Sequence, residues 1–222
     1  MHNFRKVLLA VLIGVVILLS NLTPALAAGT APVVTLNEFV ATLPAGTANQ
    51  VAGVYASSVF ALPVVQQPAG DAGFVSSQPE VLTQFALASD YGTTGLLAHN
   101  TLAGAHFSAL EAGQFLTVVY GDGRTAFFQI TAVERYQALQ PTSPYSDFVD
   151  TATQSKLSAT DLFYHIYNGN GQLVLQTCIE AEGNASWGRL FIVAEPADLE
   201  FLSIVQDTFF AASFTSLGLA QE

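Results

Sequence analysis

The chain has 222 residues, with 6 Lys and Arg against 17 Asp and Glu, and a formal net charge of −11. Such an acidic chain repels phosphate backbones, which excludes nucleic acid as a partner. Charged residues make up only 10% of the chain, against roughly a quarter in an ordinary domain, and this composition favours a β-rich core. A single cysteine rules out a disulfide within the chain, so packing has to supply the stability.

The first 27 residues have the layout of a secretory signal peptide. Arg5 and Lys6 form a basic head, residues 7–19 are an unbroken apolar run, and Ala25–Ala27 is a small-residue cleavage site. The apolar run is shorter than the roughly 20 residues that span a bilayer. We therefore expect cleavage and a secreted or extracytoplasmic location. An uncleaved anchor is the alternative, and only then do we expect contact with the membrane.

Cleavage would leave 195 residues, with four cations against all 17 acidic residues and a formal charge of −13. This length suits one domain, or at most two small ones. We expect residues 28–50 to be a linker and N-terminal extension, and residues 51–222 to form one β-barrel domain. Residues 51–65 are apolar and β-prone, and we expect Pro63 to break this run. Residues 66–79 are rich in Gly, Pro and Ser, which predicts a loop.

Turn residues predict a β-hairpin in the middle of the chain. A short strand is expected first, over Thr93–His99. The segments 114–120 and 125–133 then flank the sequence GDGR. Asp122 and Gly123 are expected to supply the positive φ angles of a tight turn between these two strands.

The C-terminal half predicts a loop, a helix and two strands. Ser158 and Asp161 have the spacing of a helix N-terminal cap. The predicted loop covers residues 141–150, the helix covers residues 158–167, and the two strands cover residues 172–179 and 189–195. Short strands with turn signals between them, and no internal repeat, indicate a mainly all-β fold. We expect a closed β-barrel of about seven or eight strands with one or two short helices.

Cys178, the only cysteine, ends the stretch LVLQTC. If the last two strands pair as a hairpin across residues 180–188, Cys178 and Arg189 flank one groove. A thiol becomes a nucleophile where an imidazolium or guanidinium stabilises its thiolate, and His99 is the candidate imidazole. From the residues alone, two interpretations stay open. Cys178 is either a small buried hydrophobe beside a structural Arg189 and His99, or the nucleophile of a catalytic site.

Metal and cofactor motifs are absent from the sequence. It has no CxxC, HxH or HExxH spacing, so we expect no zinc, no other metal and no cofactor.

The segments LLAHN, LVLQTC and GRLFIVA follow one another with plausible gaps, and FSALEAGQFLTVVYGDG lies between the first two. Together they resemble the sortase family from about Val59 to Ala194. Sortases carry a histidine after a short apolar strand, a TLxTC motif, and an arginine that opens the next strand. Val174 stands in place of the first Thr of that motif, and Ala98 stands where many sortases have Gly before the His.

The resemblance implies a sortase-like barrel and a cysteine transpeptidase that acts at the cell surface. The implied catalytic residues are His99, Cys178 and Arg189. The implied substrate-binding residues are Thr177, Gln176 and Tyr145. The implied partners are exported proteins with a C-terminal sorting motif and an amine acceptor at the cell envelope. Two alternatives are a secreted, non-catalytic β-barrel with a binding or structural role, and a thiol peptidase without an amine acceptor.

Overall fold

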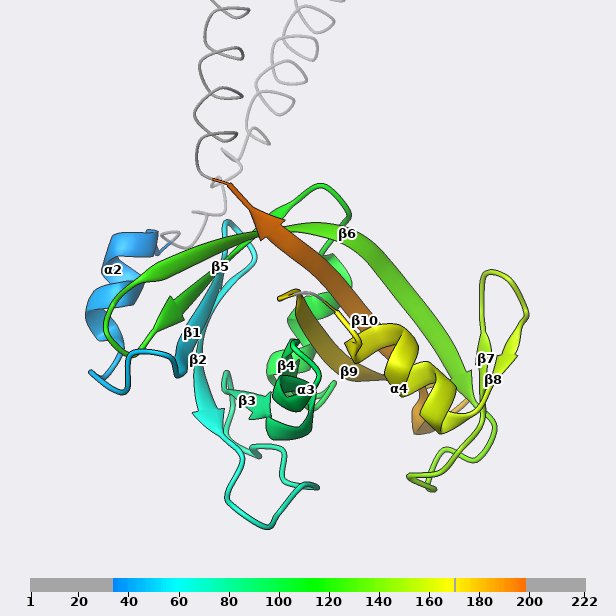
Figure 1. Ribbon diagram of the computed structural model, residues 1–222. Coiled ribbons are helices and arrows are strands. Elements are labelled where there is room, and N and C mark those ends of the chain that lie inside the picture. The colour runs from blue at the N-terminus through cyan, green and yellow to red at the C-terminus, as the bar shows by residue number, and fades with distance from the viewer. Residues whose placement is uncertain (1–33, 170, 199–222) are drawn as a thin grey trace, which may run out of the picture. The chain divides into compact units, whose positions relative to one another are not determined.

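The computed structural model of the chain describes residues 34–169 and 171–198 (Figure 1). The predicted signal peptide, residues 1–27, lies outside the described residues, as does the end of the predicted domain from residue 199 onward. Within the described ranges, no helix is long and apolar enough to cross a membrane.

The described chain is mainly β, with a few short helices. In chain order its elements are α2 (Leu36–Thr42), β1 (Val51–Ala56), β2 (Phe60–Gln66), β3 (Leu82–Phe85), α3 (Ala86–Asp90), β4 (Thr94–Leu97), the 3-10 helix η1 (Ala103–Ala109), β5 (Phe115–Tyr120), β6 (Thr125–Ala138), β7 (Phe148–Asp150), β8 (Lys156–Leu157), α4 (Ala159–Tyr167), β9 (Leu173–Ala181) and β10 (Asn184–Ala197).

The strands form one sheet that closes on itself. Its order is β10-β9-β4-β3-β2-β1-β5-β6-β7-β8, and β10 also pairs with β6. This pairing closes eight strands into a barrel, while β7 and β8 extend from β6 outside the ring (Figure 1). The expected closed β-barrel is confirmed. The short helices are more numerous than the one or two that we expected.

The apolar run 51–65 forms two strands, and the break between them does not fall at Pro63. Ser58, with φ of 63°, lies in the turn between β1 and β2. Pro63 lies inside β2, opposite Gly53 of β1, one residue before β2 begins to pair with β3. The chain therefore reverses where a left-handed residue allows a tight turn.

The predicted hairpin around GDGR is confirmed as β5 and β6, but its turn differs. Gly123 has φ of 84°, whereas Asp122 is not in the left-handed region, so that part of the prediction is wrong. The Gly123 N–H donates to the Tyr120 carbonyl (2.9 Å), and this turn needs positive φ only at its last residue. Two successive positive φ angles occur instead at Glu182 and Gly183, at 55° and 73°, between β9 and β10.

Two elements lie where the sequence predicted linker or loop. Helix α2 lies within the extension 28–50, and begins with a capping box formed by Thr35 and Glu38. Strand β7 occupies the end of the segment 141–150 that we expected to be loop, because it pairs with β6. In both cases the sequence pattern is too short to indicate the element.

Two hydrophobic cores lie on opposite faces of β9 and β10. The inner core fills the barrel and includes Leu173, Leu175 and Ile192. The outer core includes Val174 and Phe191, and α4 covers it. Figure 1 shows α4 beside β9 and β10. The α4 residues buried in this outer core are Leu162, Ile166 and Tyr167.

The closing pair of strands depends on a close backbone approach at Gly188. A Cβ at this position would lie 2.4 Å from the Tyr136 carbonyl oxygen of β6, and backbone cannot move aside as a side chain can. We expect Gly188→Ala to lower the free energy of unfolding by about 1–3 kcal/mol, the usual cost of overpacking. Urea denaturation measures it. Gly73→Ala is the control, because its nearest neighbour lies at 3.8 Å. Equal stabilities of the two variants would contradict the proposed tight closure.

Candidate active site

Cys178 and Arg189 lie directly opposite each other on β9 and β10. The antiparallel register pairs Arg189 with Cys178 and Phe191 with Gln176. Opposed residues in an antiparallel pair point to the same face of the sheet. The neighbours Val174 and Phe191 belong to the outer core, so this face is the outside of the barrel. Cys178 is partly exposed there, so it is not a fully buried core residue.

His99 follows β4, the neighbour of β9 on its other edge. The parallel register pairs Leu97 with Gln176, and the Ala98 N–H donates to the Gln176 carbonyl (3.1 Å). Extending this register by two residues sets His99 beside Cys178. His99 is exposed. His99 just after β4, Cys178 on β9 and Arg189 on β10 thus lie at one level, with the cysteine in the middle.

The three side chains do not bond to one another. Within residues 34–169 and 171–198, neither the His99 ring nor the Cys178 sulfur has a hydrogen-bond or ion-pair partner. The Arg189 Nη1 donates to the carbonyls of Ser186 (3.1 Å) and Gly188 (2.9 Å). The guanidinium carbon lies 5.9 Å from the centre of the Phe148 ring. The remaining guanidinium donors of Arg189 have no partner among the described residues.

Thr177 points the other way from Cys178. Its side chain is 4% exposed, and its hydroxyl donates to the Ala98 carbonyl (2.9 Å). Gly104 of η1 packs against it so closely that a Cβ there would lie 2.2 Å from the Thr177 oxygen. The side chain therefore ties the end of β4, just before His99, to β9. A direct contact with substrate, as the family resemblance implies, is not part of this geometry.

A cavity of about 270 Å³ lies on the same face as Cys178 and Arg189. Gln176 and Arg189 line it, and the other lining residues come from α4 and the segments around β3, β7 and β10. These are Phe85, Ser143, Pro144, Phe148, Ala159, Leu162, Phe163, Tyr167 and Phe191. Among the described residues, no carboxylate lines the cavity, although the chain is strongly acidic. Tyr145 is 85% exposed and does not line it, while its neighbours Ser143 and Pro144 do.

The aromatic wall of this cavity was not predicted from the sequence. Phe163 and Tyr167 of α4 pack against Phe85, with ring centroids 6.3 and 5.4 Å away. Their signal was the run LFYHIY in the predicted helix. That run shows an apolar helix face, but it does not show that a cavity separates part of this face from the sheet.

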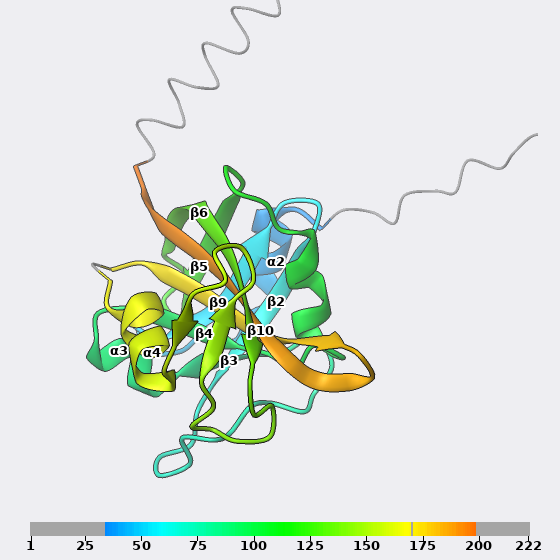
Figure 2. The ribbon, with the colours of Figure 1, turned by 90° about the vertical axis from the view of Figure 1, so that its right-hand side faces the viewer.

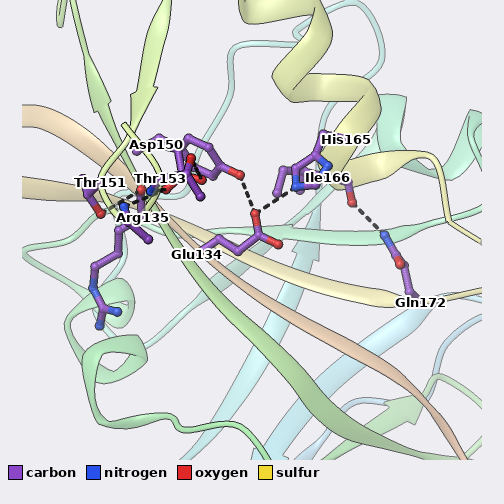
Figure 3. Close-up of polar contacts among 10 residues, drawn as sticks. Glu134, Arg135, Asp150, Thr151, Thr153, His165, Ile166 and Gln172 are labelled. Carbon is purple, nitrogen blue, oxygen red and sulfur yellow. Dashed lines mark hydrogen bonds and ion pairs between the residues drawn. The ribbon is translucent and has the colours of Figure 1, made fainter. Parts of the chain in front are cut away.

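A polar cluster ties α4 to the barrel beside the cavity (Figure 3). Glu134 of β6 accepts a hydrogen bond from Tyr136, and its Oε2 lies 3.0 Å from the His165 Nε2 of α4. Burial, with the Glu134 contact in addition, raises the pKa of Tyr136. The Ala152 N–H and the Thr153 hydroxyl lower the pKa of Asp150, which lines the same 330 Å³ hollow as Glu134 and His165.

Comparisons with known proteins find likenesses to solved structures. No protein-family model and no curated protein matches the sequence. The structure is similar to sortase C1 from Streptococcus suis (TM-score 0.45, 13% identity, 68% of this chain and 74% of that chain). It is also similar to sortase A from Corynebacterium diphtheriae (TM-score 0.43, 13% identity, 69% of this chain and 63% of that chain). A third similar structure is sortase C from Clostridium perfringens (TM-score 0.41, 11% identity, 69% of this chain and 73% of that chain). The chain thus spans just under two thirds of that sortase A. Sortases are the family that the sequence motifs resemble, and at these identities the likeness concerns the fold alone.

The polar cluster predicts a difference between two substitutions of Glu134. Glu134→Ala leaves the buried Tyr136 hydroxyl without its acceptor, so we expect the free energy of unfolding to fall by about 1–3 kcal/mol. Glu134→Gln keeps an oxygen acceptor and should cost less. Urea denaturation of both variants, with the exposed Glu111→Ala as control, measures the difference. Glu134→Ala as stable as Glu111→Ala would contradict the role of the cluster.

Proposed function

We propose that this chain is a sortase-like cysteine transpeptidase. The observation that carries the proposal is the pairing of Cys178 with Arg189 on the outer face of the barrel, beside a cavity that no carboxylate of the described part of the chain lines. His99, just after the end of β4, which pairs with β9, supplies the imidazole. The catalytic roles of these three residues are predictions from the sequence that this geometry supports.

In the first half-reaction, the Cys178 thiolate attacks the carbonyl carbon of a peptide bond. A carbon–sulfur bond forms, and the carbon–nitrogen bond breaks after a tetrahedral intermediate. His99 donates its proton to the leaving amine. Arg189 stabilises the oxyanion through the guanidinium donors that have no partner within the described residues. The acyl part of the substrate is then held on Cys178 as a thioester.

In the second half-reaction, an amine takes the place of the leaving group. The nitrogen of the incoming amine attacks the thioester carbon and gives its proton to His99. The carbon–sulfur bond breaks, and Cys178 leaves as the thiolate that began the cycle. The product is a new amide, and no cofactor or oxidant is needed.

The proposed substrates are exported proteins that end in a sorting motif, and the proposed acceptor is an amine at the cell envelope. This follows from the sequence resemblance and from the predicted signal peptide, which implies an extracytoplasmic location. A thiol peptidase would use the same first half-reaction with water as acceptor. A non-catalytic barrel would leave Cys178 unreactive. Labelling of the thiol separates this last alternative from the other two.

A substitution of Arg189 tests the role of its guanidinium in turnover. Lysine keeps the charge, but it lacks the planar fork that can hold two oxygens. We expect Arg189→Lys to lower turnover of an LPXTG-like sorting peptide on the order of 10² to 10³, the usual cost of losing an oxyanion donor. Mass spectrometry of the released peptide measures turnover. Arg135→Lys on β6 is the matched control. Turnover of Arg189→Lys equal to that of the unaltered protein would assign Arg189 a structural role.

Chemical labelling of Cys178 tests the proposal, and it does not require the sorting motif to be known. Because the thiol is partly exposed and only a thiolate attacks well, we expect iodoacetamide to label the folded protein once, at Cys178, near neutral pH. Intact mass over time follows the reaction. His99→Ala should slow the labelling or change its pH profile, because the thiol loses its imidazole partner. His106→Ala is the matched control, since His106 pairs with Glu80 instead.

Denatured protein gives the labelling rate of a fully exposed thiol. If the native protein stays unlabelled while the denatured protein reacts promptly, Cys178 is shielded in the native fold. In that case the transpeptidase proposal fails, and so does the thiol peptidase alternative.

A further inference from the structure

Gln176 lies between a buried tyrosine and the cavity. It is on the outer face of β9, two residues before Cys178 and opposite Phe191 of β10. Its side-chain oxygen accepts a hydrogen bond from the Tyr167 hydroxyl at 2.5 Å. Gln176 also lines the cavity together with Arg189.

Tyr167 decides which end of the amide faces the cavity. Its side chain is 3% exposed and packs against the rings of Phe85, Phe163 and Phe191. Within the described residues, Gln176 is the only hydrogen-bond partner of the hydroxyl. A buried hydroxyl without an acceptor is costly, and an amide NH₂ group accepts no hydrogen bond, so the amide oxygen has to face Tyr167.

Burial also raises the pKa of Tyr167, so the phenol stays protonated and remains a donor. The Gln176 Nε2 therefore points away from Tyr167. It has no partner among the described residues, and it is not enclosed by protein. The Arg189 guanidinium is the other strong donor on this wall, and the remaining lining is mostly aromatic or aliphatic.

The spacing along β9 places these donors relative to the scissile bond. Two residues of a strand span about 6.7 Å, and an extended peptide has the same rise per residue. A substrate peptide that runs along β9 therefore aligns residue for residue with this strand. The acyl part of a substrate stays attached to Cys178, whereas the leaving part has to depart. The cavity, with its mostly aromatic and aliphatic lining, suits the acyl part. The exposed side beyond Glu180, where the β9–β10 hairpin projects in the view of Figure 2, suits the leaving part.

We propose that Gln176 is a specificity-determining residue and that Tyr167 is its positioning residue. The locked Nε2 donates to the main-chain carbonyl that lies two residues before the scissile carbonyl of the substrate. An apolar side chain next to that carbonyl fills the aromatic cavity, and a cationic side chain there is rejected by the donors and by Arg189. This assignment rests on the proposed function and deepens it, because it names the substrate group that the cavity recognises.

Two peptide reagents test the assignment. The first is acetyl-Phe-Leu-Ala-Ala chloromethyl ketone, from which the Cys178 sulfur displaces chloride. The second replaces the Leu–Ala amide by a trans alkene, and so removes only the carbonyl acceptor and its N–H. Iodoacetamide, which reaches no further than the thiol, reports the intrinsic reactivity of Cys178. Rates of mass gain are measured for all three reagents.

In the unaltered protein we expect the amide reagent to react about tenfold faster than the alkene reagent, the effect of about one hydrogen bond. Gln176→Ala and Tyr167→Phe should both abolish this preference and leave the iodoacetamide rate within about twofold. The double variant should match Gln176→Ala, because Tyr167 acts only through Gln176. Tyr164→Phe, on the same helix but outside the cavity lining, is the matched control and should keep the preference.

The outcomes separate this inference from the proposed function. If iodoacetamide labels Cys178 but the unaltered protein does not distinguish the two peptide reagents, the inference fails and the proposed function stands. A preference that survives in Gln176→Ala also overturns the inference. Gln176→Ala leaves the buried Tyr167 hydroxyl without its acceptor, and the double variant removes that hydroxyl, so the double variant decides the question even if Gln176→Ala does not fold. Absence of labelling by every reagent overturns both.

Discussion

Strand β9 is packed on both of its faces, and this constraint fixes the rest of the site. Its inward side chains, Leu173 and Leu175, are fully buried in the barrel, and its outward Val174 is fully buried under α4. A shift of one residue would exchange the two sets, so the register is strongly specified. Because the register is held, Cys178 must face outward and Thr177 inward. The hydroxyl of Thr177 then ties β9 to the end of β4, where His99 follows.

Closure of the barrel places the elements that cover the site from outside, namely α4 and β7. The pairing of β10 with β6 leaves β7 and β8 outside the ring, and the chain returns to β9 through α4. That helix covers the outer face of β9 and β10 without filling all of the space over it, which creates the cavity. The contact between Glu134 of β6 and His165 links α4 to the barrel (Figure 3). The short β7 strand brings Phe148 to the Arg189 guanidinium.

The charge distribution agrees with the proposed chemistry. The chain carries 17 acidic residues, yet none of those within residues 34–169 and 171–198 lines the cavity beside Cys178. A carboxylate there would stabilise a cation and repel a developing oxyanion or a thiolate. Gln176 and Arg189 line the cavity, and each carries N–H donors without a partner among the described residues. Such a wall suits a peptide that brings its own carbonyl acceptors, and it leaves an amine acceptor to approach from the exposed side.

The sequence by itself determined the β-rich class, the hairpin around GDGR, the capped helix at Ser158, and the strands that carry Cys178 and Arg189. These features depend on the alternation of apolar and polar residues and on turn residues, and both act over only a few positions. The sequence did not determine the turn type at Asp122, the place of the break near Pro63, or the helix α2, where short local patterns are ambiguous. It also missed the cavity and the inward direction of Thr177 as a tie to Ala98. These depend on which strands meet across the barrel and on how far α4 stands from the sheet. Only the packed tertiary structure sets those distances, because they result from contacts between residues that are far apart in the chain.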